Sequence, residues 1–233
     1  MKILTIAVAL TITAAALVAE TPQERLASSA DVFAEVMHTP DKGIPQELLD
    51  DAACIVVLPG VKKAAFVLGG QYGRGFVQCR RESGQGWAGP AAVRMEGGSV
   101  GFQIGGSNTD LILLVRNHHG MEKLLGDKFT LGADASAAAG PVGRTANAST
   151  DVRMKAEILA WSRAQGLFAG ISLNGATLRP DEDVNRHLYG RRLTNREILL
   201  GHVSPPASAH RLIAELNRYS PHREGEADRS EHR

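Results

Sequence analysis

This chain of 233 residues has almost no net charge and contains few cysteine and aromatic residues. The 26 Lys and Arg residues almost balance the 25 Asp and Glu residues, and a formal charge of +1 excludes a strongly basic nucleic-acid binder. Two cysteines are too few for a disulfide-dense scaffold or a cysteine-rich zinc module. Aromatic residues make up only 5% of the chain, whereas glycine occurs 25 times. This composition favours a turn-rich β structure over a helical bundle.

Long apolar runs are also missing, except at the start. Residues 1–19 read MKILTIAVALTITAAALVA, a basic start followed by an apolar segment with small residues at Ala14 and Ala16. This pattern predicts a cleaved signal peptide, and therefore a periplasmic or secreted protein. The alternative is a membrane anchor, but the run is at the short end for a span and lacks a basic flank after it. No cysteine lies near its end, so a lipoprotein anchor is not expected.

The two cysteines lie in separate apolar, strand-like runs. Cys54 belongs to ACIVVLP and Cys79 to GFVQCR. An oxidising compartment permits a disulfide between them if the two strands are neighbours. Two buried thiols are the alternative, and the sequence leaves both open.

Periodicity predicts an α+β fold in a single domain. The capping box from Thr21 to Glu24 starts a helix whose apolar stripe includes Leu26 and Phe33. The polar face of this helix is acidic, which favours packing on the protein's own core over lying on a membrane. From residue 54 onward, short β-like runs predict a curved, barrel-like antiparallel sheet of seven to nine strands, with a hairpin through residues 164–166. Short helices are expected over 45–52, 117–125, 181–189, 194–200 and 207–219.

The domain organisation follows from these elements. We expect a signal peptide (1–19), one main domain (20–204), a C-terminal helix (205–220) and a disordered tail (221–233), whose composition is charged and poor in apolar residues. The C-terminal helix carries His210, Arg211 and Arg218 beside its apolar stripe. Its charge suits contact with an anionic surface better than the charge of the first helix does.

Two motifs suggest chemistry, but their contexts argue against it. The segment 97–101 matches G-x-S-x-G, yet a strand pattern follows Ser99 where a hydrolase needs a helix. The acidic run from Asp181 to Asp183 resembles the start of a calcium loop, but Arg186 and Arg192 stand where that loop needs Gly and Glu. A helix cap explains Asp181 better. Because no nucleophile, base and orienting residue stand together, we expect neither an enzyme nor a metal or cofactor site.

Basic residues are concentrated around two of the strand-like runs. These are Lys62, Lys63, Arg74, Arg80 and Arg81. If the strands are adjacent, the cations cluster and attract anionic headgroups by about 1 kcal/mol each. Scattered, solvated ion pairs are the alternative that the sequence leaves open.

Six blocks in order resemble the SYLF domain family over about residues 22–190. They are IVVLPGVKKAAFVLGGQYGRG, GWAGPAAVRMEGGSVGFQIGG, TDLILLV, FTLGADASAAAGPVGR, WSRAQGLFAGISLNGATL and LYG. The resemblance implies membrane-lipid binding. Eukaryotic members bind phosphoinositides and, in fungi, actin filaments, whereas secreted bacterial members are envelope proteins. Neither actin nor phosphoinositide is expected as a partner outside a bacterial cytoplasm.

The matching blocks supply the expected lipid contacts. Lys62 and Lys63 lie in PGVKK, Arg74 in QYGRG and Arg144 in GPVGR. We therefore expect a non-enzymatic lipid-binding protein of the cell envelope that contacts anionic phospholipid headgroups, with no nucleic-acid partner. An envelope structural or protein-interaction module is the alternative. A hydrolase that uses Ser99 is the second.

Overall fold

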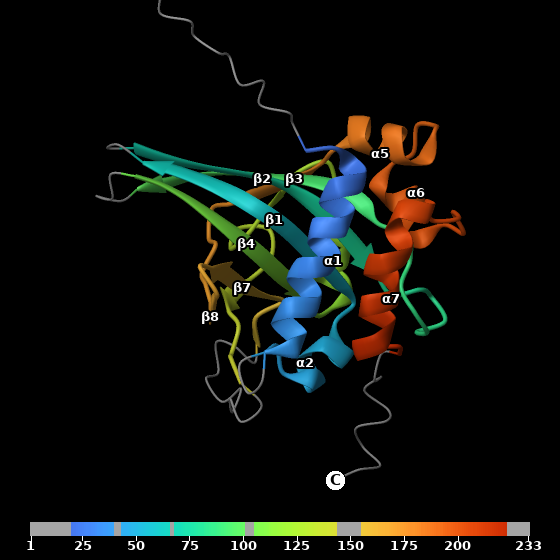
Figure 1. Cartoon of the computed structure of the whole chain (residues 1–233), viewed down its shortest axis with the longest axis horizontal. Coiled ribbons are helices and arrows are strands. Elements are labelled where there is room, and N and C mark those ends of the chain that lie inside the picture. Colours follow the sequence, from blue (N-terminus) through green and yellow to red (C-terminus); the bar gives the residue numbers. More distant parts are fainter. Residues whose placement is uncertain (1–19, 40–42, 66–67, 101–104, 144–154, 223–233) are drawn as a thin grey trace, which may run out of the picture.

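A single curled sheet forms the centre of the molecule (Figure 1). The computed structural model describes residues 20–39, 43–65, 68–100, 105–143 and 155–222. The expected signal peptide, Arg144 and residues 223–233 of the expected tail lie outside these ranges. The strands are β1 (Cys54–Ala65), β2 (Leu68–Cys79), β3 (Ala91–Val100), β4 (Gly105–Val115), β5 (Phe129–Thr130), β6 (Ala137–Ala139), β7 (Ile158–Ala164), β8 (Leu167–Gly170) and β9 (Thr177–Pro180).

The sheet order is β5-β9-β3-β2-β1-β4-β7-β6, and β8 pairs with β7 through the expected hairpin. The α+β fold with a curved sheet is confirmed, but one pair of strands departs from the expected antiparallel arrangement. β6 runs parallel to β7, with Ala138 opposite Leu159. The connection between these two strands is long enough for the crossover that parallel neighbours need, and short strand-like runs cannot reveal its direction.

The strands alternate between an inner and an outer face. The inner face carries one core cluster, which includes Val56, Val77 and Leu113. The outer face carries a second cluster, which includes Phe76 and Ile112 and extends into the helices. Because successive strand residues point to opposite faces, each long strand contributes to both clusters.

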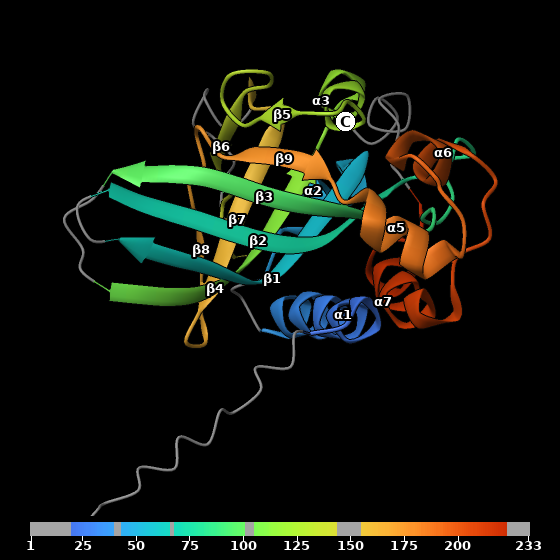
Figure 2. The same cartoon turned by 90° about the horizontal axis from the view of Figure 1, so that it is seen from above.

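Helix α1 (Pro22–His38) covers part of the outer face, and α7 (His210–Tyr219) lies beside it (Figures 1 and 2). The capping box of Thr21 and Glu24 forms as expected. Leu26 and Phe33 are fully buried, and the Phe33 ring meets the edge of Tyr219 at 5.9 Å between centroids. The first helix therefore packs on the protein's own core.

The other helices also form where periodicity predicted them. They are α2 (Gln46–Asp51), α3 (His118–Leu124), α5 (Glu182–Tyr189), α6 (Asn195–Leu200) and the short 3-10 turn η1 (Ala207–Ala209), which leads into α7. In the ranges that the structure describes, no helix is both long and apolar enough to cross a membrane.

Two features stabilise the covered end of the sheet, one between two strands and one between the sheet and the helices. Cys54 and Cys79 are directly opposite each other on β1 and β2, and a disulfide links them. Arg80 is buried, donates hydrogen bonds to the carbonyls of Ser220 (2.5 Å) and Leu49 (3.3 Å), and stacks on the Trp87 ring. Arg80 therefore belongs to an internal network that holds the end of α7, and it does not join a surface cluster of cations.

Beyond α1, the strands β1 to β4 continue as a projecting ribbon (Figures 1 and 2). A bulge in β1 at Pro59 and Gly60 marks where the pairing shifts, between Leu58 and Val61 on one side and between Val57 and Lys62 on the other. Gly60 has a φ of +62°, a left-handed conformation that glycine adopts without strain. The Gly60 N–H donates to the Asp110 carboxylate on β4 at 2.9 Å. The bulge therefore lies where the helix-covered sheet gives way to the ribbon.

Candidate functional site

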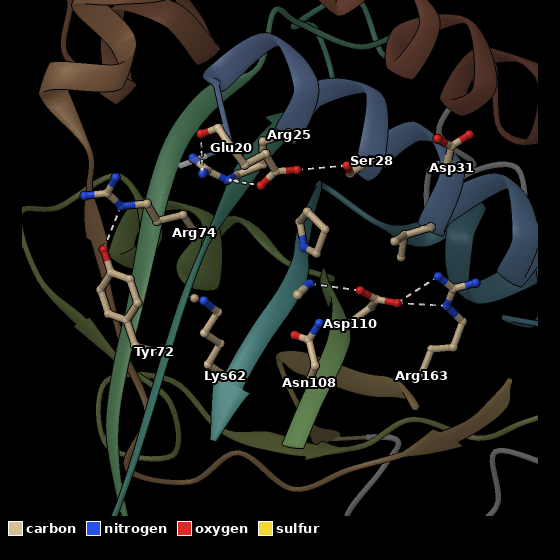
Figure 3. A pocket seen from close by; sticks show the side chains of 14 residues that line it. Glu20, Arg25, Ser28, Asp31, Lys62, Tyr72, Arg74, Asn108, Asp110 and Arg163 are labelled. Atoms are coloured by element: carbon tan, nitrogen blue, oxygen red, sulfur yellow. Dashed lines mark hydrogen bonds and ion pairs between the residues drawn. The ribbon is translucent and has the colours of Figure 1, made fainter. Parts of the chain in front are cut away.

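A groove of about 870 Å³ lies between α1 and the outer face of the sheet (Figure 3). Arg25 and Asp31 line it from α1, and residues of β1, β2, β4 and β7 form the other wall. The groove lies where the covered part of the sheet meets the projecting ribbon.

Strand register explains why these side chains meet. Lys62 on β1 is directly opposite Tyr72 on β2 and Asn108 on β4. Asp110 on β4 is directly opposite Arg163 on β7. Directly paired residues share a face with their Cβ atoms about 5 Å apart, so the sheet places all five side chains on the outer face.

One end of the groove is closed by ion pairs. Asp110 Oδ2 accepts hydrogen bonds from Arg163 Nε (2.9 Å) and pairs with Nη2 (2.8 Å), and Arg163 also pairs with Glu35 of α1. Burial raises the pKa of the Asp110 carboxyl, opposed by the hydrogen bond from Gly60 N–H, and burial lowers the pKa of Arg163. These charges satisfy one another and join α1 to the sheet.

The rim formed by the start of α1 is also internally paired. Glu20 accepts a hydrogen bond from Arg25 Nε at 3.0 Å and another from the Ser28 hydroxyl at 2.9 Å. The Arg25 side chain is only 11% exposed. Neither Glu20 nor Arg25 is therefore well placed to attract a charged ligand.

The opposite end of the groove is open and carries cations. Lys62 is exposed, and among the described residues no carboxylate pairs with its ammonium group. Arg74 Nε donates to the Tyr72 hydroxyl at 2.6 Å and lies 3.3 Å from Asp181 Oδ2. Tyr72 is 43% exposed, one of two large apolar side chains exposed to this extent in the described ranges. This end presents two cations and an amphipathic ring to solvent, and of the two cations only Arg74 has a carboxylate beside it.

The structure separates the lysines that the sequence places together. Lys62 and Lys63 are consecutive on β1, so they point to opposite faces of the sheet. Lys63 shares the inner face with Gln71 and Ser107, its direct partners on β2 and β4. Of the expected contacts, the fold brings together Lys62 and Arg74, while Arg144 lies outside the described residues.

The two motifs weighed for chemistry occupy structural positions. Ser99 lies within β3 opposite Gly69, a strand position without the strand-to-helix turn of a hydrolase nucleophile. Asp181 stands at the N-cap of α5, but its side chain makes no capping hydrogen bond and pairs with Arg74. Asp183 pairs with Arg186 at 2.8 Å. No group of three or more potential metal ligands occurs within the described ranges.

Sequence reasoning missed two members of this site. Tyr72 is two residues before Arg74 in a strand, and this spacing places both side chains on one face. The two-residue period of the strand could therefore have predicted that Tyr72 belongs to the site. Asp181 is 107 residues from Arg74 in the chain, and no local pattern connects them. Only the pairing of β3 with β9 brings Asp181, which follows β9, to this face.

Comparison with known proteins finds one matching family model and several similar curated proteins. A family model described as "Ysc84: Las17-binding protein actin regulator" matches residues 96–219, which include α7. SH3 domain-containing protein PJ696.02 of Schizosaccharomyces pombe is 38% identical over 178 residues, 75% of this chain and 41% of that protein. SH3 domain-containing YSC84-like protein 1 of Rattus norvegicus is 34% identical over 191 residues, 82% of this chain and 56% of that protein.

A yeast relative completes the comparison. LAS seventeen-binding protein 3 of Saccharomyces cerevisiae is 31% identical over 179 residues, 76% of this chain and 39% of that protein. The chain therefore spans about half the length, or somewhat less, of the curated relatives that it matches. The name of the Saccharomyces cerevisiae relative and the description of the family model both refer to binding, which favours a binding role over a catalytic one.

Proposed function

Because the chain belongs to the SYLF (Ysc84) family, we propose that it is a non-enzymatic protein of the cell envelope that binds anionic phospholipid headgroups. The contact lies at the open end of the groove, where Lys62 and Arg74 face solvent beside Tyr72. Each cation near a membrane surface contributes about 1 kcal/mol of attraction to anionic lipid. An exposed Tyr suits the interface, because its ring is apolar and its hydroxyl is polar.

The absence of a carboxylate partner for Lys62 among the described residues is the observation that supports this proposal most. The other charged groups of the groove have partners, such as Asp110 with Arg163 and Glu20 with Arg25. Lys62 lies one row further along the ribbon and has no carboxylate partner among the described residues. An ammonium group without a counterion gains most from an anionic ligand.

Export from the cytoplasm is the second part of the proposal. It is supported by the apolar segment of residues 1–19 and by the Cys54–Cys79 disulfide, since such bonds persist in oxidising compartments. Cell fractionation with N-terminal sequencing tests it. We expect the protein outside the cytoplasm, beginning after the apolar segment. Recovery in the cytoplasm with residues 1–19 retained would contradict export.

Vesicle flotation of the purified protein tests headgroup binding. We expect binding to phosphatidylcholine vesicles that contain phosphatidylglycerol, weaker binding as salt is raised, and none to phosphatidylcholine alone. Lys62→Gln should weaken binding about fivefold, the equivalent of about 1 kcal/mol.

Lys63→Gln is the matched control, because it removes the same charge from the next residue on the opposite face. It should leave binding close to the unmodified level. Equal losses from both variants would show that only overall charge matters and would contradict a site on the outer face. No binding of the unmodified protein at low salt would remove the proposal.

A protein-interaction module is the second candidate, favoured by the names of the relatives. One is named for binding LAS seventeen, and the family model is described as a Las17-binding actin regulator. For this chain, the corresponding proposal is an envelope module that binds a protein partner and no lipid. Isolation of a stoichiometric complex with one identified partner, together with failure of the flotation assay, would favour it.

A further inference from the structure

Three arginines occupy one row across the outer face, on strands far apart in the sequence. Arg74 on β2 is directly opposite Arg94 on β3, and Arg94 is directly opposite Arg179 on β9. Side chains at directly paired positions share a face with their Cβ atoms about 5 Å apart. Arg74 lines the groove on the outer face, so Arg94 and Arg179 extend a line of guanidinium groups from the groove to β9. We call these three residues the arginine row.

The carboxylates near the arginine row do not balance it. Glu96 lies 3.2 Å from Arg94 and 3.9 Å from Arg179, so two arginines share one carboxylate. Asp181 pairs with Arg74. Three guanidinium groups therefore have two carboxylates, and Lys62 adds a fourth cation two strand positions away on the same face. The local charge is positive on a chain whose formal net charge is only +1.

Folding alone does not favour such a row. Like charges at directly opposite positions destabilise a sheet, and Arg94 has an arginine on both sides. The three side chains are 45%, 39% and 38% exposed, so solvent and ligands reach them. An anion held between the guanidinium groups would offset their repulsion.

We infer that the arginine row binds the phosphate groups of lipid headgroups and extends the headgroup site from the groove to β9. This inference rests on the proposed function and adds Arg94 and Arg179 to it. Guanidinium groups bind phosphate oxygens through two parallel hydrogen bonds, which an ammonium group cannot do. Three neighbouring strands span about 10 Å, so the row reaches more than one phosphate.

The setting of the row favours a membrane surface over a soluble anion. Small soluble ligands are usually enclosed in concave pockets. The arginine row lies on an open sheet face beside the exposed ring of Tyr72, which suits an interface where a polar surface meets an apolar one. The row and the groove together place four cations, Lys62, Arg74, Arg94 and Arg179, on one face of the sheet.

The test is a double substitution with a matched control. Arg94→Gln with Arg179→Gln removes two charges from the row, and Arg191→Gln with Arg192→Gln removes two exposed charges between α5 and α6. In flotation with phosphatidylglycerol-containing vesicles, we expect the first variant to bind about 25-fold more weakly, about fivefold for each charge removed, and the second to bind almost as the unmodified protein does. If the double variant does not fold, Arg179→Gln alone replaces it, with an expected loss of a few fold.

Thermal unfolding separates a binding role from a structural one. The substitutions relieve repulsion between like charges and also remove two exposed ion pairs with Glu96, so the two small effects oppose each other and the melting temperature should change little while vesicle binding falls. A lower melting temperature with unchanged binding would overturn the inference and leave the row with a structural role. Equal loss of binding in the control variant would overturn it as well.

The remaining outcomes separate this inference from the proposed function. If the unmodified protein binds vesicles and the double variant binds equally well, only the arginine row is refuted. If the unmodified protein binds no vesicles, both fail. Inorganic tripolyphosphate is the soluble probe. If it stabilises the unmodified protein but not the double variant, while vesicles do not bind, the row holds a soluble anion and the assignment to lipid headgroups is overturned.

Discussion

The strands β1 to β4 pass through two environments. In the covered half, residues such as Val57, Phe76 and Ile112 are buried beneath α1 and its neighbours. In the projecting half, the same face carries Lys62 and Tyr72, and it ends in small residues such as Gly70. The backbone pairing continues through both halves, so hydrogen bonding does not distinguish them. The difference predicts that stability depends mainly on the covered half, and it leaves the projecting half available for the charged site that we propose.

The largest expected effect compares one aromatic residue from each half of β2. Phe76→Ala leaves a cavity in the outer-face core and should lower the free energy of unfolding by about 3–5 kcal/mol. Tyr72→Ala removes a 43% exposed ring and should change it by less than about 0.5 kcal/mol. Urea denaturation measures both values.

The same pair of variants should give the opposite order in vesicle binding, where Tyr72→Ala is the damaging change. Leu167→Ser removes the other exposed large apolar side chain, from β8, and serves as the control. A large loss of stability from Tyr72→Ala would show that the projecting half is part of the core, which would end the comparison between the two halves.

The second prediction concerns the disulfide of the covered half. The bond closes a loop with a sequence separation of 25 residues, for which the chain-entropy model gives about 3.5 kcal/mol. Replacing Cys54 and Cys79 together with Ala should therefore lower the free energy of unfolding by about that amount. Vesicle binding should not change at temperatures where the variant stays folded. Adding reductant to the unmodified protein should lower its melting temperature to a similar extent, and should not affect the double variant.

The sequence predicts local structure well, because local rules determine it. The capping box at Thr21, the alternation in the strands and the short C-terminal helices all form where their patterns lie. The order of the strands depends on long-range packing that no local pattern contains. The parallel pairing of β6 with β7, the disulfide left open between Cys54 and Cys79, and the separation of Arg80 from the surface cations follow from that order.

The candidate site was only partly predictable for the same reason. The basic residues near the two strand-like runs indicated an anionic ligand, and the two-residue period of a strand already separates Lys62 from Lys63. The arginine row, however, joins positions 74, 94 and 179, and it exists only in the register of β2, β3 and β9. The arginines that lie side by side on the surface are distant in sequence, so composition alone cannot show that they are neighbours.

Glycines in the two halves give the smallest expected effects and the sharpest contrast. Gly75 lies in the covered half, where an added Cβ would stand 2.0 Å from the Val57 carbonyl oxygen on β1. Because β1 cannot move without disturbing the core, Gly75→Ala should lower the free energy of unfolding by about 1–3 kcal/mol. Gly70 lies in the projecting half, where an added Cβ meets nothing within 4 Å. Gly70→Ala should raise the free energy of unfolding by up to about 1 kcal/mol, because it restricts the unfolded chain.

Chemical denaturation of the two variants measures the difference in the free energy of unfolding. Gly98→Ala, where an added Cβ also meets nothing within 4 Å, should repeat the result of Gly70→Ala. If both Gly70→Ala and Gly98→Ala destabilise the protein as much as Gly75→Ala does, other parts of the protein pack tightly against the ribbon. The proposal that the ribbon is free to bind a membrane surface would then be wrong.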